Sequence, residues 1–515
     1  MNGAITWYTM NGIAPDLIPS EVPPSVWTRC SDMVFRGQPE RIAGRLSVFG
    51  TPLFPPQWLQ DARSSGEAPI WVYAADAGLG VTDGTIHTDI TPASGWGALP
   101  FPNPFTGGTL NGVVVVGSGS FFYYDGAPKA LPLPGWPAGF TANAMRPYKY
   151  HLIAMGITDN GTLLEDLLLW SAAAVPGEIP QTWAPAPDNE AGSLALSQTG
   201  GEIVDGFPLR QSFCVYKDTS TYIIDYIGGT NVMQARLLYP NSGLLCRNGV
   251  ALYRGDHYAL TDGDIVVNDG QQITSIADRV VRRRIFGFID GENFRNSFAV
   301  ADEARSEVWF CVPEQGHTLP NVAWIYNVGT QKWGRRELPG DVAHIGVGPV
   351  RLSTGPVVWD QFPMVWDLKP GVWLQSSGRV NNNSLLEAAP GANKLYAVDL
   401  DYSRDGVVVN GSLEREYLDL GQPDAVKTIR RVWLTAQSFS TGQRLQISVG
   451  ASQSLEVAPT YEAPVLYTIG VDRKVDIYAT GFFISLKIEA YDDGIARQPW
   501  RVGKVGFEYT LRGMF

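Results

Sequence analysis

Cysteine is scarce in this sequence, and its spacing argues against the common cysteine-based sites. The four cysteines, Cys30, Cys214, Cys246 and Cys311, lie far apart and form no CxxC pair. Zinc sites and disulfide frameworks need closely or regularly spaced cysteines. We therefore expect four reduced thiols packed in apolar surroundings, in preference to a disulfide.

Motifs of the common enzyme classes are also missing. The sequence contains no HExxH, GxxxxGKS/T or GxSxG, and no GxGxxG after a predicted strand, so metalloprotease, P-loop, α/β-hydrolase and dinucleotide-binding interpretations have no support. Its five histidines include no pair at metal-ligand spacing. A propeller glycosidase needs two facing carboxylates, and 51 Asp and Glu allow such a pair without identifying it. We predict no enzyme activity, no catalytic residue and no cofactor.

The chain contains fewer basic than acidic residues, 39 Lys and Arg against 51 Asp and Glu. The formal net charge of −12 argues against a basic surface that wraps nucleic acid. It is compatible with an acidic passage through which DNA slides without sticking. No stretch approaches eighteen consecutive apolar residues, and the start, MNGAITWYTM, lacks the basic segment and apolar core of a secretory signal. We expect a soluble protein, without a membrane span, that is made in the cytoplasm.

Glycine and proline, in contrast, are abundant and spread along the whole chain. The 56 Gly and 36 Pro, with 11% aromatic residues, are typical of many short strands joined by turns. The clearest example runs from Asn248 to Ile276, where four apolar or alternating runs are separated by RGD, TDG and NDG. Glycine accepts the positive φ of tight hairpin turns. We predict a four-stranded antiparallel meander at this place, in an all-β protein.

Similar groups of runs recur along the chain with a period of about 45 residues. We interpret them as about six or seven irregular blades of a β-propeller at residues 65–411, because radial closure protects sheet edges that an open array would expose. The groups begin near residue 68 and recur at 111–133, 148–170, 192–227, 248–276, 297–333 and, less clearly, 342–410.

Both ends of the chain differ from this pattern. Residues 412–515 contain longer strands with clean apolar and polar alternation, such as FFISLKIEA at 482–490, which predicts an antiparallel β-sandwich. Residues 1–64 are rich in proline and contain two short extended runs, Met33–Arg36 and Arg45–Phe49. We interpret them as an arm that lies across other elements. An arm that completes the C-terminal sandwich would make the propeller an insertion.

One stretch has the pattern of a helix. Ile276 to Phe286, IADRVVRRRIF, is basic in an acidic protein. Its arginines are candidates for contact with an acidic neighbouring subunit or with DNA phosphates, and a solvated helix face paired with local carboxylates explains them equally simply. We favour the solvated face or the subunit contact over DNA. The candidates are Arg279, Arg282, Arg283 and Arg284.

A second stretch resembles part of a calcium loop. Asp401, Ser403 and Asp405 place oxygen ligands at alternate positions before Gly406, as in the first half of such loops. Ser412 stands where the bidentate Glu of a calcium loop is expected. A hairpin turn explains the segment better than a metal site. We therefore predict no metal, with these three residues as the weak calcium candidate.

Four segments together resemble the tail nozzle or hub proteins of short-tailed bacteriophages, also described as packaged-DNA stabilisation or tail tubular proteins. The similarity is diffuse and extends over nearly the whole chain. The segments are PPSVWTRCSDMVFRGQPERIAG at 23–44, LLLWSAAAVPGEIPQTWAP at 167–185, EAGSLALSQTGGEIVDGFPLRQSFCVYKDTSTYIIDYIGG at 190–229 and SLEREYLDLGQPDAVKTIRRVWL at 412–434.

The resemblance implies a structural, non-enzymatic subunit of the virion tail that assembles as a ring, hexameric in the family, below the portal and tail adaptor proteins. Such a ring continues the DNA channel, retains packaged DNA, serves as the ejection conduit and allows DNA to pass without sequence-specific binding. Tail fibres or spikes are further partners, and synthesis takes place in the host cytoplasm. The alternative is a propeller that binds or cleaves carbohydrate.

Overall fold

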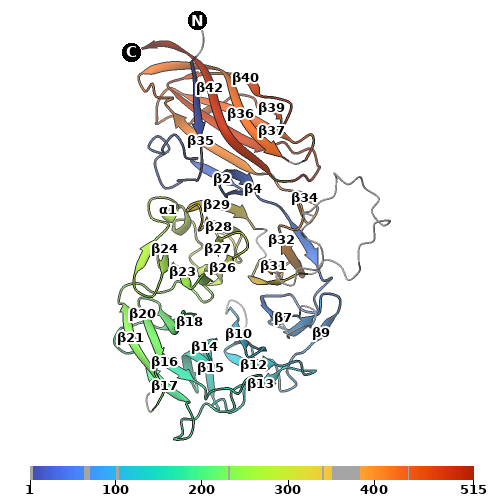
Figure 1. Ribbon diagram of the computed structural model, residues 1–515, viewed down its shortest axis with the longest axis vertical. Coiled ribbons are helices and arrows are strands. Elements are labelled where there is room, and N and C mark those ends of the chain that lie inside the picture. The colour runs from blue at the N-terminus through green and yellow to red at the C-terminus, as the bar shows by residue number, and fades with distance from the viewer. Residues whose placement is uncertain are drawn as a thin grey trace.

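The computed structural model describes residues 4–62, 70–99, 104–229, 232–338, 342–350, 383–438 and 440–514. Two β-rich parts lie one above the other along the long axis of the molecule, a ring of small sheets and a sandwich of longer strands (Figure 1). The predicted fold class, a β-propeller with an antiparallel β-sandwich, is confirmed. No helix in these residues is long and apolar enough to cross a membrane.

Five blades of the ring are four-stranded antiparallel sheets made of consecutive strands. We number them blades 1 to 5. Their strands are β6 (Trp58–Asp61), β7 (Trp71–Ala75), β8 (Gly78–Thr82) and β9 (His87–Asp89); β10 (Thr106–Leu110), β11 (Val113–Ser118), β12 (Ser120–Tyr124) and β13 (Leu131–Pro132); β14 (Phe140–Tyr148), β15 (His151–Asp159), β16 (Thr162–Trp170) and β17 (Gly192–Ala195); β18 (Ile203–Leu209), β19 (Ser212–Lys217), β20 (Thr221–Tyr226) and β21 (Met233–Tyr239); and β22 (Val250–Tyr253), β23 (Asp256–Thr261), β24 (Asp264–Asn268) and β25 (Ile273–Ser275).

Blade 5 is the meander predicted at Asn248–Ile276. Its first hairpin turns through Arg254 and Gly255, which have φ of 50° and 87°. A two-residue turn with two positive φ values matches the twist of the flanking strands, so this RGD sequence is a hairpin turn. The grouping of 192–227 as one repeat was wrong at its start, because β17 pairs with β16 and belongs to blade 3.

Two further blades complete the ring with help from the N-terminal arm. Blade 6 consists of β26 (Phe298–Asp302), β27 (Glu307–Val312), β28 (Val322–Asn327) and β29 (Lys332–Glu337), and the arm strand β3 (Met33–Phe35) pairs with β29. Blade 7 consists of β30 (His344–Pro349), β31 (Asn383–Ala389), β32 (Lys394–Val398) and the arm strand β5 (Arg45–Val48). The hairpin β33 (Ser403–Arg404) and β34 (Val407–Val408) continues that sheet beyond β5. The last blade is thus closed by a strand that precedes the first blade in the sequence.

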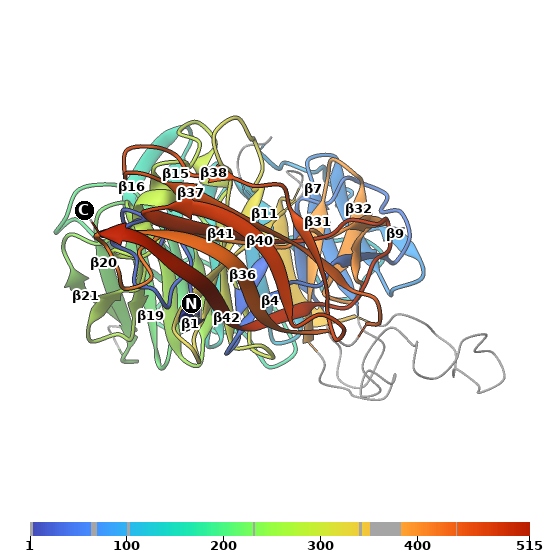
Figure 2. The same cartoon turned by 90° about the horizontal axis from the view of Figure 1, so that it is seen from above.

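The sandwich is built from both ends of the chain. One sheet contains β2 (Arg29–Ser31), β35 (Ser412–Leu418), β41 (Phe483–Ala490), β37 (Arg444–Ser452), β38 (Thr460–Tyr461) and β39 (Val465–Thr468). The other contains β1 (Ala4–Thr9), β42 (Trp500–Met514), β36 (Ala425–Ser438) and β40 (Lys474–Gly481), and β4 (Pro39–Arg41) joins it to β3 and blade 6. Figure 2 shows these long strands across the top of the molecule. One hydrogen-bonded sheet therefore runs from the propeller into the sandwich.

Apolar side chains pack between neighbouring sheets around the whole ring. Trp71, Tyr73 and Leu386 fill the space between blades 1 and 7, for example, and each is at most 2% exposed. The largest cluster includes side chains of blades 5 and 6 and of both sandwich sheets, Tyr258, Trp324, Ile488 and Phe507 among them. Since burial of apolar surface is the main stabilising term in folding, the shared cluster makes the two parts one packed body.

The helix predicted over Ile276–Phe286 is wrong in length. Only α1 (Arg282–Phe286) is helical, and a short 3₁₀ turn, η1 (Phe294–Asn296), follows it. Arg279 has φ of 59°, a left-handed conformation that interrupts a right-handed helix. The preceding residues form turns instead.

Candidate functional sites

A buried charged cluster lies near the axis of the propeller. Arg146 on β14 donates two hydrogen bonds to the Asp205 carboxylate, at 2.9 and 2.6 Å, and one to Asn248 Oδ1 at 2.7 Å. Arg146 also donates to the carbonyl of Gly107, and Asn248 donates to the carbonyl of Phe105. These residues belong to blades 2 to 5. The bidentate pair joins blades 3 and 4, and the other hydrogen bonds of Arg146 and Asn248 connect them to blades 2 and 5.

A small cavity lies beside this cluster. A cavity of about 30 Å³ is bordered by Trp58, Phe105, Asn248, Phe298 and His344, which come from five different blades. That volume is enough for about one water molecule. Burial lowers the pKa of His344 to about 3, and the positive charge of Arg146 acts in the same direction.

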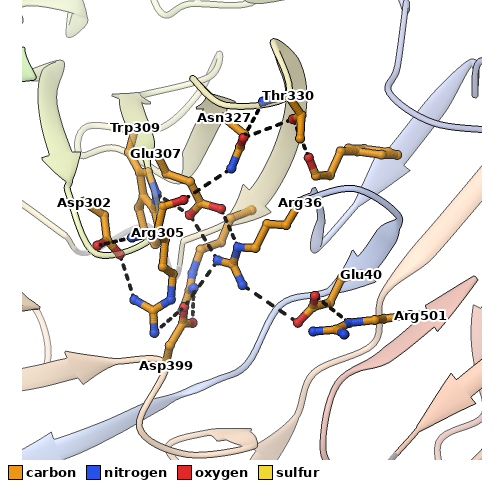
Figure 3. Close-up of polar contacts among 12 residues, drawn as sticks. Arg36, Glu40, Asp302, Arg305, Glu307, Trp309, Asn327, Thr330, Asp399 and Arg501 are labelled. Carbon is orange, nitrogen blue, oxygen red and sulfur yellow. Dashed lines mark hydrogen bonds and ion pairs between the residues drawn. The ribbon is translucent and has the colours of Figure 1, made fainter.

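A second cluster lies where the arm passes between the propeller and the sandwich (Figure 3). We call it the arm junction. Arg36 binds Glu307 of blade 6 through Nε at 2.6 Å and Nη2 at 3.1 Å, and the Glu307 side chain is fully buried. Glu40 on β4 lies 3.8 Å from Arg36 Nη1 and accepts a 2.8 Å hydrogen bond from Arg501 of the sandwich. The arm junction therefore links three parts of the molecule through charged side chains.

Asp399, which follows β32 of blade 7, is the acidic centre of this junction. Three guanidinium groups surround its carboxylate, those of Arg336 at 2.7 Å, Arg305 at 3.4 Å and Arg36 at 3.9 Å. Burial alone would raise the pKa of Asp399, but the three arginines outweigh it and lower the pKa to about 2. The Asp399 side chain is 5% exposed. This carboxylate stays charged at neutral pH and holds blades 6 and 7 and the arm together.

Two more ion pairs extend this connection. Arg404 donates a 2.6 Å hydrogen bond to Asp32 of the arm. Arg45 on β5 donates a 2.9 Å bond to Glu387 on β31, and its guanidinium lies 3.7 Å from the ring centre of Tyr396. A directional, charge-assisted bond fixes position in a way that apolar packing does not. These pairs therefore hold the arm strands in place along blade 7.

The four candidate arginines come together around α1 but have different surroundings. Arg284 points inward, where it pairs with Glu314 at 3.0 Å and lies over the ring of Phe288. Arg282 donates to the carbonyl of Gly263 and lies 3.7 Å from Asp278. Arg279, whose side chain is 89% exposed, and Arg283 lie at the surface.

The arm also fixes the start of this helix. The carboxylate of Asp16 accepts hydrogen bonds from the backbone N–H groups of Arg283 and Arg284, both at 2.8 Å. An acidic side chain at a helix N-terminus satisfies backbone donors that lack a partner within the helix. The helix that carries the arginines is thus held in place by the arm. Arg279, Arg282 and Arg283 are exposed, and of these Arg282 already bonds to the carbonyl of Gly263.

The calcium candidates form a turn stabilised by protein groups. Asp401 accepts hydrogen bonds from the backbone N–H of Tyr402 and the hydroxyl of Ser403. Asp405 accepts bonds from Lys394 at 2.6 Å and from the hydroxyl of Tyr396 at 3.1 Å. In the part of the chain that the structure describes, no group of three His, Cys, Asp or Glu residues is arranged to hold a metal. The four cysteines are free and buried, as predicted.

Sequence reasoning identified neither charged cluster. Nothing near Arg36 or Arg146 in the sequence indicates their main partners, which are 271 and 59 positions away. A charged residue inside an apolar strand pattern, such as Glu307 beside VWFCV, is the one available signal, because such a residue needs a partner when it is buried. The sequence does not say which partner it finds.

Comparison with known proteins gives similarity in fold alone. No protein-family profile and no curated protein matches the sequence. Among solved structures, the WD40 domain of Pan2 from Neurospora crassa is 8% identical, with 70% of this chain and 94% of that chain covered and a TM-score of 0.35. YCF48 from Cyanidioschyzon merolae is 8% identical, with 69% and 99% covered and a TM-score of 0.35. The extracellular domain of BT4673 from B. thetaiotaomicron is 8% identical, with 85% and 57% covered and a TM-score of 0.37.

The chain is a β-propeller protein. Within the described residues, seven four-stranded units follow one another around an axis.

Proposed function

We propose that the chain is a structural, non-enzymatic subunit of a ring in the tail of a short-tailed bacteriophage, of the nozzle or hub type. In this proposal the ring continues the DNA channel below the portal and adaptor proteins, retains packaged DNA and serves as the ejection conduit. The chain then acts in the virion, and its partners are further copies of itself, the adaptor proteins and tail fibres or spikes.

The observation that carries the proposal is the arm junction. The arm contributes strands to the sandwich through β1 and β2, extends blade 6 through β3 and completes blade 7 through β5. Buried ion pairs of Arg36, Glu307 and Asp399 hold it there. A conduit subunit must keep its parts aligned under load, and a continuous sheet with buried charge pairs between the parts supports such a role.

The axis cluster bears on where DNA would pass in this proposal. The buried cluster of Arg146, Asp205 and Asn248 lies near the axis of the propeller, and the channel in this proposal lies in the middle of the ring of subunits. The net charge of −12 favours passage over binding, since phosphates are repelled and few counterions are released.

We assign the exposed arginines beside α1 to contact between subunits. Arg279 and Arg283 are at the surface of an acidic protein, so a neighbouring copy offers a surface of opposite charge. Tight packing of the arm against α1 through Asp16 keeps these side chains at a fixed place.

Negative-stain electron microscopy and light scattering of the purified full-length chain test the proposal. We expect ring-shaped particles, and a double variant R279E/R283E that dissociates at about tenfold higher concentration than the wild type. The matched control is Arg236→Glu, because Arg236 is an exposed arginine on blade 4.

Polysaccharide hydrolysis by the same preparation is the second measurement, and we expect no turnover. A monomer at all concentrations would contradict the ring. A monomer that also cleaves surface glycans would support the carbohydrate-active alternative instead.

A further inference from the structure

The sandwich sheet that contains β42 has an unprotected edge. Within the described residues β1 pairs with β42 alone, in an unbroken register from Ala4 opposite Tyr509 to Thr9 opposite Lys504. Its sequence, AITWYT, has no charge, no proline and no bulge, which are the usual devices that keep an edge strand from pairing with other chains. Ile5 and Trp7 are 45% and 49% exposed. Such an edge favours pairing with a further strand.

The opposite edge of the same sheet is β40. It pairs with β36 alone among the described residues, and its side chains alternate strictly between exposed and buried. The order across the sheet is β1, β42, β36 and β40, and each neighbouring pair is antiparallel. Strand β40 therefore runs opposite to β1. When a second copy of the sheet is placed beside the first by a rotation, its β40 meets β1 in the antiparallel direction of every other pair in the sheet.

Side chains on the outer face complement each other across this contact. One row across the sheet contains Trp7, Gly506, Trp433 and Lys474. The Trp7 ring covers Gly506 and lies 6.5 Å from the Trp433 ring, and the Lys474 ammonium lies 5.4 Å from the Trp433 ring centre. Lys474 is thus an aromatic-bound cation at one edge, and Trp7 is a half-exposed aromatic ring at the other. Continuing the row into a second copy brings that lysine to Trp7, which adds a cation–π contact.

We propose that β1 of one copy pairs with β40 of the next copy, so that the sandwich sheets join edge to edge around the ring. This inference rests on the proposed ring and names its contact. A contact between two different edges is heterologous, and repeated rotation closes it into a ring in which neither edge stays exposed. Pairing through an added strand is an established mode of recognition, with backbone hydrogen bonds as its main attraction.

Cysteine cross-linking of the full-length chain tests the proposal. In the row that contains Glu508 and Arg431, Ile5 ends one edge and Asp476 ends the other, and both side chains point outward. The double variant Ile5→Cys with Asp476→Cys then places two thiols opposite each other across the contact. Within one chain the two positions are three strands apart, roughly 14 Å, too far for a disulfide. The four native cysteines are buried.

We expect oxidation to give a ladder of covalent oligomers that ends at the size of the ring. The matched control, Val407→Cys with Asp476→Cys, uses an exposed valine of another sheet and gives no ladder. Hydrogen exchange provides a measurement that does not depend on register. The amides of β1 and β40 exchange at least tenfold more slowly in the assembled particle than in the dissociated chain.

The remaining outcomes each overturn the proposal in a recognisable way. Covalent dimers of the single variant Ile5→Cys would show that β1 pairs with β1 around a two-fold axis. Rings that form without cross-linking and without protection of either edge would exclude this contact and leave the ring itself intact. A chain that never assembles would contradict the proposed function and this inference together.

Discussion

The axis cluster and the arm junction are both buried and charged, but they connect different kinds of neighbours. At the propeller axis, Arg146 has one carboxylate partner, Asp205, and both come from neighbouring blades of the ring. At the arm junction, Asp399 pairs with three arginines from different segments. Arg36 also pairs with Glu307, which is 271 positions away in the sequence. The axis cluster fixes blades that are already neighbours in the chain. The junction cluster holds segments that nothing in the local sequence brings together, which explains why it uses more charges.

The largest expected loss of stability follows from a substitution at the arm junction. In the variant Asp399→Asn, three arginines lose their shared carboxylate in a buried site, which we expect to cost about 3–5 kcal/mol of unfolding free energy. Calorimetry should also show blade 7 and the arm unfolding in a separate, earlier transition, because Asp399 holds them to blade 6. The matched control is Asp225→Asn, which breaks an exposed pair with Arg236 and should cost less than about 1 kcal/mol. A single unchanged transition would refute the coupling role of the junction.

A smaller loss of stability is expected from a substitution in the axis cluster. The variant Asp205→Asn leaves Arg146 with the oxygens of Asn248 and Gly107, so we expect a loss of about 3 kcal/mol. Urea unfolding followed by tryptophan fluorescence measures it. Because the axis cluster touches neither the arm nor the sandwich, the unfolding transition should move to lower urea without splitting. Splitting into two transitions would show that the two clusters do not differ as described.

The smallest expected effect is a pH dependence of stability that comes from a histidine between two blades and not from the junction. Between blades 4 and 5, His257 is fully buried, with Nδ1 bonded to the Tyr216 hydroxyl at 2.9 Å and Nε2 to the Pro208 carbonyl at 2.8 Å. Burial lowers the pKa of His257 to about 4. The unfolded chain then binds a proton near pH 6.5 while the folded chain does not, so stability is full above that pH and falls as the pH drops toward 4.

We expect the loss from His257 between pH 7 and pH 5 to be about 2 kcal/mol. The junction should keep its strength over this range, since Asp399, with a pKa of about 2, loses stability only as the pH falls from near 4 toward 2. Thermal unfolding at both pH values provides the measurement. The variant His257→Asn should reduce the pH dependence, and an equal dependence in the variant would exclude His257 as its source.

Local pattern predicted the strands well. The glycine turns of 248–276 correctly predicted all four strands of blade 5, and the alternating run at 482–490 corresponds to β41, which begins at Phe483. Such patterns work because a hairpin turn or an alternating strand is decided by residues close together in the chain. The helix at 276–286 failed because apolar periodicity does not reveal the left-handed conformation of Arg279.

The sites were much less predictable than the strands. The four arginines near α1 were found as a group, but the inward turn of Arg284 toward Glu314 depends on β27 and the segment that follows it. Asp401 and Asp405 looked like neighbouring ligands in the sequence. The structure turns Asp405 toward Lys394 and Tyr396 of β32, with the hairpin of β33 and β34 paired to β5, the strand between it and β32.

The sequence by itself determined an all-β chain of glycine-hinged meanders followed by longer alternating strands, since turn geometry and side-chain alternation are local properties. Only the tertiary structure decided that β5 closes blade 7, that β1 forms an edge beside β42, and that Arg36 meets Glu307 and Asp399. These contacts join residues hundreds of positions apart. They depend on how whole sheets pack, and no short stretch of sequence carries that information.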